Sequence, residues 1–555
     1  MNSIFIISDF NAEPLARYLL NDHDDSLSVE MAPFGQVFQS LSDKTMRDDS
    51  VVWTLPEKII PTFARAVEFY KIDIDSCLNE VAVFANALLD FSTRSQYVFV
   101  ASWLIAEDNR GYGMLDWRNG LGLNNLLARM NLHLADLLAE ASNIYMLDAS
   151  HWSVAKSQSM SPKMWYAAKV PYSNAVYENA AMDITAAITA LAGKSKKLIV
   201  VDLDNTLWGG VVGETGWQGI RLGGHDFVGE AFCDFQRNLL ALSRRGIQLA
   251  IVSKNDEAVA LEAIDNHSEM LLRREDFSGW RINWHDKAEN IASLIKELNL
   301  GLDSVIFIDD NATERDRVRG AFPQILVPDW PKDPTAYVST LRKLNCFDTP
   351  AVSDEDRMRT EMYAAERERH NTIKSVTSSD DWLRQLNIKL TVSSINQSNL
   401  SRVTQLFNKT NQLNLSTRRL SEKEVLEWSS NKSNFLLAVF VSDSFGDMGL
   451  VGVIGIEAKG TLGIISDFIL SCRAMGRQVE QAMIYLTVSE LSRVGIKNVQ
   501  ARYLPTERNR PTLDIFRSIG FNEPQENLFV FDYEKTLLKP DAIEIHCDSE
   551  IFELL

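Results

Sequence analysis

Short apolar runs alternate with longer amphipathic segments over the first 185 residues of the chain. Runs of about four to eight apolar residues are typical of buried strands, and the longer segments have the periodicity of helices. The alternation predicts a parallel sheet covered by helices. The strands are expected at residues 3–8, 50–55, 96–103 and 143–148.

A second alternation of strands and helices predicts another α/β domain over residues 194–345. Its apolar runs cover residues 197–201, 247–253 and 304–309. The segment that follows, residues 346–385, is expected to be a helical connector. Ser353 precedes three acidic residues there, as at the N-terminus of a helix.

The pattern changes again from residue 386 onward. A helix is expected first, then a series of strands, a second helix and a last strand, which predicts a mixed α+β domain over residues 386–540. The strands are expected at residues 434–444, 449–459, 461–471 and 527–534. Residues 541–555 are expected to be a short acidic tail.

Length, composition and charge narrow the class of protein. The 555 residues correspond to three or four domains, and 45% hydrophobic with 24% charged residues is an ordinary globular composition. The net charge of −19 argues against general nucleic-acid binding, because phosphate backbones would be repelled. We expect a cytoplasmic protein, since no apolar run approaches the roughly 18 residues of a membrane span and the N-terminus lacks a basic signal region.

The cysteines do not form a recognisable framework. They are widely spaced and include no CxxC pair, so neither a zinc site nor a set of disulfide bonds is predicted. They are Cys77, Cys233, Cys346, Cys472 and Cys547.

Two carboxylates follow directly from an apolar strand in the stretch KKLIVVDLDNTLWGGVVGE, residues 196–214. Asp202 and Asp204 lie two residues apart, where bare carboxylates would cost several kcal/mol without a nearby cation. Their spacing suits phosphoryl transfer through an aspartyl phosphate, with Asp202 as nucleophile and Asp204 as general acid and base. One Mg²⁺ would bind the pair and offset the charge of the transferred group.

Three further polar groups come after later strands, in the order that this chemistry requires. Ser253 comes 51 residues after Asp202, Lys287 another 34 residues on, and Asp309 a further 22. These intervals fit successive strand–helix units of one sheet, whose carboxyl ends meet at one edge. We expect Ser253 and Lys287 to bind phosphate and Asp309 to bind the metal.

This ordered set of motifs resembles the haloacid dehalogenase superfamily. The resemblance implies a Rossmann-like domain in which Asp202, Asp204 and Asp309 bind Mg²⁺, with Asp309 preferred to Asp310 because it comes first after its strand. It also implies phosphate- or substrate-binding residues at Thr206, Ser253, Lys254, Asn255 and Lys287.

The glycine-rich interval after the first motif, WGGVVGETGWQGIRLGG, is too short for a large capping domain. The site is therefore expected to be open to a bulky or protein-bound substrate. Trp208 and Trp217 are expected to pack a flap rather than to contact substrate.

The motifs DLDNTLWGGVVGE, VSKND, WHDKAENI and FIDDNATER resemble more closely the FkbH-like branch of this superfamily, and so do several segments of the C-terminal domain, among them FILSCRAMGRQVE. The branch occurs in polyketide and surface-polysaccharide pathways. The resemblance implies transfer of a glyceryl unit from 1,3-bisphosphoglycerate to an acyl carrier protein, with removal of phosphate, and a C-terminal domain like GCN5 acetyltransferases.

Glyceryl transfer needs a nucleophile that holds the acyl group, and Cys472 is the candidate. It is expected at a strand-to-helix junction, where Arg473 and the helix N-terminus would favour the thiolate. The alternative is a buried, inert cysteine.

The same loop resembles the R-x-x-G-x-G/A motif whose backbone N–H groups bind the pyrophosphate of coenzyme A in GCN5-like enzymes. Arg473 and Gly476 fit this motif, but Gln478 stands where a small residue is expected. A phosphopantetheine arm on a carrier protein tolerates this loop better than coenzyme A does.

Residues 1–185 resemble the SGNH-hydrolase fold. Asp148 and His151 keep that family's Asp-x-x-His, but Phe10 stands where its nucleophilic Ser belongs, and Ser8 is the nearest substitute. We expect a degenerate docking or binding domain rather than an active esterase.

Four functions remain open at this point. The first is a glyceryl transferase and phosphatase, and the second is a plain phosphatase acting on a sugar phosphate in capsule or lipopolysaccharide synthesis, with Cys472 inert. In the third, the terminal domains only recruit a carrier or pathway enzyme. The fourth is an acetyl-coenzyme A-dependent acetyltransferase fused to the phosphatase.

Overall fold

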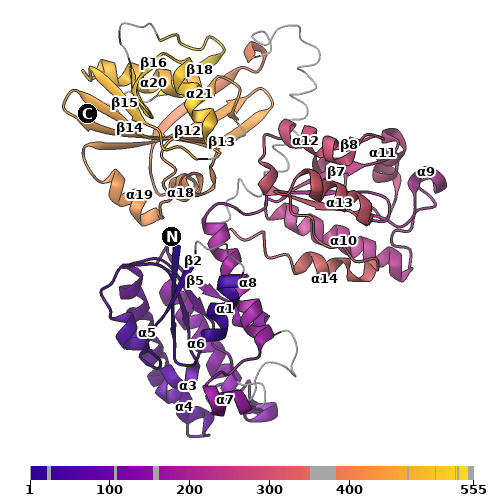
Figure 1. Cartoon of the computed structure of the whole chain (residues 1–555), viewed down its shortest axis with the longest axis vertical. Helices are drawn as coiled ribbons and strands as arrows, with labels where there is room; N and C mark the ends of the chain where they lie inside the picture. Colours follow the sequence, from indigo (N-terminus) through magenta and orange to yellow (C-terminus); the bar gives the residue numbers. More distant parts are fainter. Residues whose placement is uncertain are drawn as a thin grey trace. The chain divides into compact units, whose positions relative to one another are not determined.

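Three sheets organise the described part of the chain in the computed structural model (Figure 1). The structure describes residues 2–21, 27–105, 109–139, 141–153, 162–349, 383–471, 474–506, 508–531, 533 and 537–547. They form two units, Met1–Ile188 and Thr189–Leu555. The second unit contains two sheets, which define a four-stranded module (residues 194–349) and a C-terminal module (residues 383–547).

The N-terminal unit has a five-stranded parallel sheet in the order β2-β1-β3-β4-β5. The predicted parallel sheet is thus confirmed, and the sequence pattern missed only β2. The strands are β1 (Asn2–Ser8), β2 (Leu27–Met31), β3 (Arg47–Trp53), β4 (Ser95–Ala101) and β5 (Ile144–Leu147). The α-helices are α1 (Glu13–Asn21), α2 (Val37–Leu41), α3 (Pro56–Ile59), α4 (Pro61–Val67), α5 (Ile74–Ser92), α6 (Leu123–Leu138), α7 (Pro162–Ala168) and α8 (Asn174–Leu191).

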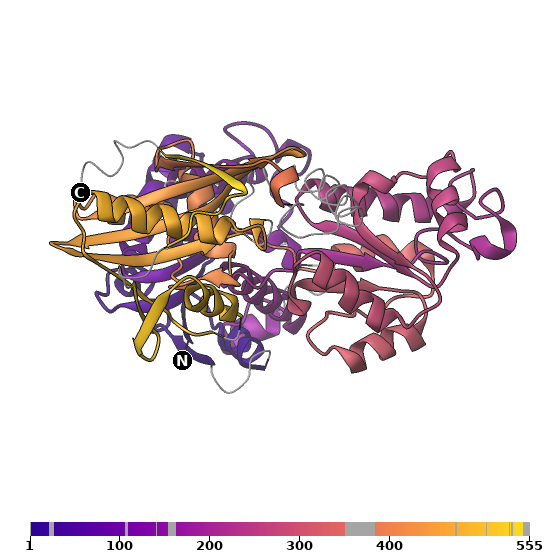
Figure 2. The same cartoon turned by 90° about the horizontal axis from the view of Figure 1, so that it is seen from above.

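The four-stranded module is a parallel sheet in the order β8-β7-β6-β9, with helices on both faces (Figure 2). Its strands are β6 (Leu198–Val201), β7 (Gln248–Ser253), β8 (Phe277–Ile282) and β9 (Val305–Ile308). Its α-helices are α9 (Val212–Thr215), α10 (Phe227–Arg244), α11 (Glu257–Asn266), α12 (Lys287–Glu297), α13 (Ala312–Ala321) and α14 (Tyr337–Arg342).

Alternate residues of β6 explain these two helix layers. Ile199 and Val201 pack with α10, α11 and α14, whereas Leu198 and Val200 pack with α12 and α13. All four side chains are fully buried, as expected for a strand covered on both faces. Because the four strands are parallel, their carboxyl ends share one edge of the sheet.

The C-terminal module has a mixed sheet in the order β16-β17-β15-β14-β13-β12-β10-β18, and β11 pairs with β14. Its strands are β10 (Ile388–Ser394), β11 (Leu413–Asn414), β12 (Asn434–Asp443), β13 (Gly446–Lys459), β14 (Leu462–Leu470), β15 (Asn498–Arg502), β16 (Phe521–Gln525), β17 (Leu528–Phe531) and β18 (Ile543–Cys547). Its helices are α18 (Leu400–Lys409), α19 (Glu422–Ser429), α20 (Val479–Arg493) and α21 (Arg510–Ser518). The predicted mixed α+β class is confirmed.

Two expectations for this module need correction. Residues 388–394 form β10 before the first helix, because Ile388, Leu390 and Val392 alternate with polar residues and bury one face of the strand. The expected acidic tail contains β18, which pairs in parallel with β10.

Within the described part of the chain, none of the helices has the length and apolar character needed to cross a membrane. Most of the expected helical connector lies outside the described residues.

Candidate active site

Four predicted side chains meet at the carboxyl edge of the four-stranded sheet. Asp202 follows β6, Ser253 ends β7 and Asp309 follows β9. Lys287 begins α12, the helix that follows β8, and the side chain of Asp286 caps this helix by accepting a hydrogen bond from the Glu289 N–H. Neighbouring parallel strands therefore bring together groups that lie up to 107 residues apart in the sequence.

Lys287 lies between two of the carboxylates. Its Nζ is 3.0 Å from Asp202 Oδ1 and 2.6 Å from Asp309 Oδ2. The three residues are at most 6% exposed. Burial lowers the pKa of Lys287, but the two carboxylates outweigh this effect and raise the pKa above its ordinary value. The lysine is therefore a buried cation whose loss would leave two uncompensated carboxylates.

Asp202, Asp309 and Asp310 form a carboxylate cluster. One oxygen from each of them lies within 4.8 Å of the others. Burial first, and then the charge of Asp202, raises the pKa of both Asp309 and Asp310. A cluster of carboxylate oxygens whose negative charge is only partly balanced suits a hard divalent cation, which prefers oxygen ligands.

Two predicted residues adjoin this cluster in different ways. Thr206 is fully buried, and its Oγ1 accepts a hydrogen bond from the Asp310 N–H at 3.2 Å and lies 3.4 Å from Asp310 Oδ1. It therefore positions Asp310 in this structure. Asp204 is not a member of the cluster.

The Asp204 carboxylate is instead held by three donors. Its Oδ1 accepts from Trp208 Nε1 at 2.9 Å and from the Val212 N–H at 3.1 Å, and its Oδ2 accepts from Asn255 Nδ2 at 2.8 Å. Burial raises the pKa of Asp204 even though these hydrogen bonds lower it. A fixed carboxyl with a raised pKa suits a general acid.

The chain after Asp204 makes a tight turn stabilised by long-range contacts. Asn205 has a φ of 55°, a left-handed conformation that Asn tolerates well, and its Oδ1 accepts from the Gly210 N–H. The Tyr337 hydroxyl donates to the Asn205 carbonyl at 2.8 Å. Trp208 is fully buried and Trp217 packs against the same core, as the flap interpretation expects.

The remaining predicted phosphate ligands lie close to the edge but differ in orientation. Ser253 is 2% exposed at the end of β7. Lys254 pairs with Glu314 of α13 at 2.6 Å, so its charge is directed to that helix. Asn255 contacts Asp204, as described above.

Sequence reasoning missed two supporting residues. Arg315 donates from Nη1 to the carbonyls of Asp309 and Asp310, each at 2.8 Å, and so fixes the end of β9. The indole of Trp208 has a polar partner, although the sequence indicated only packing. The signal for Arg315 was present in FIDDNATER, in the first turn of the helix that follows the carboxylates.

The loop after β14 differs from the expected anion-binding loop. The N–H of Gly476 donates to Glu480 Oε1 at 2.7 Å, so in this structure it is not available to a phosphate. Burial raises the pKa of Glu480. Cys472 and Arg473 lie outside the described residues.

A segment of the chain fills the fork between β14 and β15. These strands pair only from Leu462 to Ile465, and β11 takes the place of β15 beside Ile469 and Leu470. The Leu415 N–H donates to the Phe468 carbonyl, and the Leu415 carbonyl accepts from the Leu504 N–H, each at 3.0 Å. The backbone edge exposed by the diverging strands is thus satisfied by the chain itself.

The predicted residues of the N-terminal unit do not form a triad. Ser8 is 5% exposed, and its Oγ accepts from the Phe10 N–H at 3.2 Å. The His151 side chain is 80% exposed, with its Nε2 3.6 Å from Asp148 Oδ2. Among the described residues, no hydrogen bond joins Ser8 to His151.

Aromatic side chains occupy the carboxyl ends of β1 and β3 in the same unit. Trp53 stacks on Tyr172 with ring centroids 4.9 Å apart, and it also contacts Phe10, Trp152 and Tyr177. In open α/β sheets this crevice is the usual ligand site. Its filling by packed rings supports the interpretation of a degenerate domain.

A solved structure matches a large part of this chain. The solved N-terminal part of the protein BF1531 from Bacteroides fragilis, which contains a phosphatase domain complexed with Mg, is 26% identical to this chain with a TM-score of 0.58. The match covers 63% of this chain and 94% of that one. The chain matches no protein-family model and no curated protein.

Two solved acetyltransferases align with a smaller part of the chain. One is a GNAT-family enzyme from Staphylococcus aureus, at 7% identity, a TM-score of 0.21 and coverage of 26% of this chain and 98% of that one. The other is the ribosomal-protein-S18-alanine N-acetyltransferase from Escherichia coli, at 12% identity, a TM-score of 0.21 and coverage of 26% and 92%. Scores this low support no conclusion about function.

Proposed function

We propose that this chain is a Mg²⁺-dependent phosphatase that works through an aspartyl phosphate on Asp202. The observation that carries the proposal is the convergence of Asp202, Lys287 and Asp309 at one sheet edge, at 3.0 and 2.6 Å from the lysine nitrogen. The Mg²⁺ in the solved BF1531 phosphatase domain supports the choice of metal.

Phosphoryl transfer begins with attack of an Asp202 carboxylate oxygen on phosphorus. The new O–P bond forms as the bond to the leaving oxygen breaks, and Asp204 gives that oxygen its proton. Water then attacks phosphorus and gives a proton to Asp204. The bond between phosphorus and Asp202 breaks, which releases inorganic phosphate and restores both carboxyls.

The surrounding residues position these groups. Lys287 would balance the phosphoryl charge, and Ser253 would donate to a phosphoryl oxygen. Asp202, Asp309 and Asp310 would hold Mg²⁺, which supplies charge neutralisation at the transferred group when bound. Trp208, Val212 and Asn255 keep Asp204 oriented toward the leaving oxygen.

We further propose that the phosphatase is coupled to glyceryl transfer through Cys472. Its thiolate would attack the acyl carbon of 1,3-bisphosphoglycerate, forming a C–S bond as the acyl C–O bond breaks and phosphate leaves. The pantetheine thiol of an acyl carrier protein would then attack the thioester and release the cysteine. The active site at Asp202 would remove the remaining phosphate. The resemblance to FkbH-like proteins supports this step.

Mass spectrometry of the intact chain tests the coupled reaction. The full-length protein is incubated with Mg²⁺ and 1,3-bisphosphoglycerate, and Cys472→Ala is compared with the matched variant Cys547→Ala. A glyceryl-sized or phosphoglyceryl-sized adduct should appear on wild type and Cys547→Ala and be absent from Cys472→Ala. An adduct that survives in Cys472→Ala would contradict the role of this cysteine.

The second candidate function is a phosphatase without acyl transfer, acting on a sugar phosphate. The observation that favours it is that the carboxylate cluster, Lys287 and Asp204 all belong to the four-stranded module. Phosphate release with no adduct on any variant would support this candidate and move the search to sugar phosphates.

A further inference from the structure

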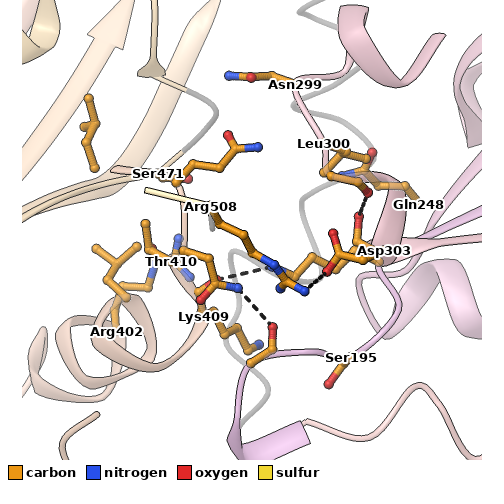
Figure 3. Close-up of a pocket in the computed structure, with 18 residues that line it drawn as sticks. Ser195, Gln248, Asn299, Leu300, Asp303, Arg402, Lys409, Thr410, Ser471 and Arg508 are labelled. Carbon is orange, nitrogen blue, oxygen red and sulfur yellow. Dashed lines mark hydrogen bonds and ion pairs between the residues drawn. The ribbon is translucent and has the colours of Figure 1, made fainter. Parts of the chain in front are cut away.

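A cavity lies away from the active site, within the unit Thr189–Leu555. It has a volume of about 210 Å³ and is lined by residues of both modules of that unit (Figure 3). Lys197 and Ser304 immediately precede β6 and β9, and Gln248 begins β7. The cavity is therefore at the amino ends of these strands, roughly 13–20 Å along the sheet from the carboxylates.

The lining is strongly basic for so acidic a chain. Four basic side chains and one carboxylate give it a formal charge of +3, whereas the whole chain has a net charge of −19. We call this site the basic cavity. Its charged residues are Lys197, Arg402, Lys409, Arg508 and Asp303.

Contacts with the protein hold Lys197, Arg402 and Arg508 at the wall. Arg508 pairs with Asp303 (Figure 3), with a nitrogen–oxygen distance of 2.6 Å. Lys197 Nζ donates to the Lys409 carbonyl at 3.2 Å, and Arg402 Nε donates to the Leu450 carbonyl at 3.3 Å. The basic side chains repel one another in this partly buried space. An anion that enters the cavity reduces this repulsion, so its binding is favoured.

The other lining residues define the kind of anion. Leu300, Leu406 and Leu470 offer apolar contact for a short carbon chain, whereas Asn299 and Gln412 offer neutral polar groups. The volume is below the roughly 300–1,000 Å³ of pockets for drug-sized ligands. The cavity thus suits a small organic anion rather than a whole nucleotide.

We propose that the basic cavity binds a small phosphorylated carboxylic acid, at a site separate from the phosphatase centre. The charges would face the phosphate and carboxylate groups, and the leucines would contact the carbon chain. The choice of a three-carbon acid rests on the proposed function, because a phosphoglyceryl group is the acyl unit that the chain would handle.

Calorimetric titration of the full-length chain with 3-phosphoglycerate tests this proposal. EDTA is present, so that binding at the carboxylate cluster through a metal is excluded. The double variant Lys409→Gln/Arg508→Gln should bind at least about tenfold more weakly, because charge-assisted contacts are lost. Lys423→Gln, on α19 with a 73% exposed side chain, is the matched control and should bind as wild type does.

Two further variants separate this proposal from the phosphatase assignment. Asp202→Asn should stop phosphate release yet keep its affinity for 3-phosphoglycerate in EDTA. Lys197→Gln removes a charge from a different wall of the cavity and should also weaken binding. It replaces the double variant if that variant does not fold. Thermal unfolding checks the fold of Lys197→Gln.

Several outcomes would overturn the proposal. The first is that wild type does not bind 3-phosphoglycerate. The second is that the folded cavity variants bind it as tightly as wild type does. The third is that Asp202→Asn loses the binding. Inorganic phosphate is the second probe. If it binds as tightly as 3-phosphoglycerate, the assignment of a carboxylic acid is refuted.

Discussion

Lys287 is the cation on which the active-site edge depends. It lies between Asp202 and Asp309, and all three are buried. We expect Lys287→Met to lower phosphate release at least about 100-fold, since the charge that stabilises the phosphoryl group is lost. Kinetic assays with Mg²⁺ and p-nitrophenyl phosphate measure this.

Lys296→Met, on the exposed face of the same helix, is the matched control and should keep near wild-type activity. Equal activity of Lys287→Met and wild type would show that the buried lysine serves stability alone.

Trp208 orients the general acid. Its Nε1 donates to Asp204 Oδ1 at 2.9 Å. Trp208→Phe keeps the ring but removes this donor, so kcat should fall about tenfold with little change in KM. Trp217→Phe, in the same flap, should leave kcat within about twofold. A change in KM without a change in kcat would place Trp208 in substrate binding instead.

The buried Asp49 carboxyl is expected to make the free energy of unfolding depend on pH. Burial raises the pKa of this β3 carboxyl from 3.8 to about 7, and the charge of Asp48 adds to the effect. Below pH about 4 the carboxyl is protonated in both folded and unfolded chains. Between pH 4 and 7 only the unfolded chain releases the proton, so the free energy of unfolding falls as pH rises.

Asp49→Asn should therefore stabilise the chain by roughly 2–4 kcal/mol at pH 8 and have little effect near pH 4. Chemical denaturation of the full-length chain at both pH values measures this, followed through the unfolding of the N-terminal unit. Asp136→Asn, on the exposed face of α6, is the control. The same gain at both pH values would contradict burial of the charge as the cause.

At the scale of elements, β11 occupies a strand edge of the C-terminal module at which a ligand could otherwise bind. A ligand inserted between diverging strands binds a free strand edge by main-chain hydrogen bonds, so the carrier arm in the proposed glyceryl transfer must reach Cys472 by a route other than this fork. Here β11 pairs with the end of β14, and its neighbour Leu415 bonds to both sides of the fork. Leu413, Asn414 and Leu415 are fully buried, so displacement of this segment would be costly.

We therefore expect no binding of coenzyme A to the full-length chain. Glu480 adds to this expectation, because its carboxyl already accepts from Gly476, where a pyrophosphate would need the N–H. Calorimetry with coenzyme A at millimolar concentration checks it. Clear binding would contradict a permanently closed fork and would restore the acetyltransferase hypothesis.

The sequence predicted elements best where a strand is covered on both faces. Residues 197–201 and 304–309 stand out because every residue of β6 and β9 is buried, which requires a continuous apolar run. β10 has the alternating pattern of a half-buried strand, so its signal was present in the sequence and was overlooked. β11 has two residues and is defined only by its partner strand, so no local pattern could reveal it.

At the scale of the whole molecule, spacing between motifs carried more information than any single motif. The order of Asp202, Ser253, Lys287 and Asp309 predicted one sheet edge, and the structure brings all four there. The orientation of each side chain was not predictable in the same way. Asn255 contacts Asp204 and Lys254 contacts Glu314, because packing across different strands and helices decides which way each side chain lies.

Like the side-chain orientations, the basic cavity could not be predicted from the sequence. Its charged residues come from four separate stretches of sequence. Only the fold of the second unit places them around one space. Net charge alone therefore describes the chain poorly, since an acidic protein contains a local site of opposite sign.

Phosphate release by the full-length chain tests the central claim most directly. Wild type, Asp202→Asn and the control Asp234→Asn, an exposed position on α10, are assayed on p-nitrophenyl phosphate with Mg²⁺ and again with EDTA. We predict release by wild type and Asp234→Asn that EDTA abolishes and Mg²⁺ restores, with none above background from Asp202→Asn. Undiminished release by Asp202→Asn, or release unaffected by EDTA, would contradict the account.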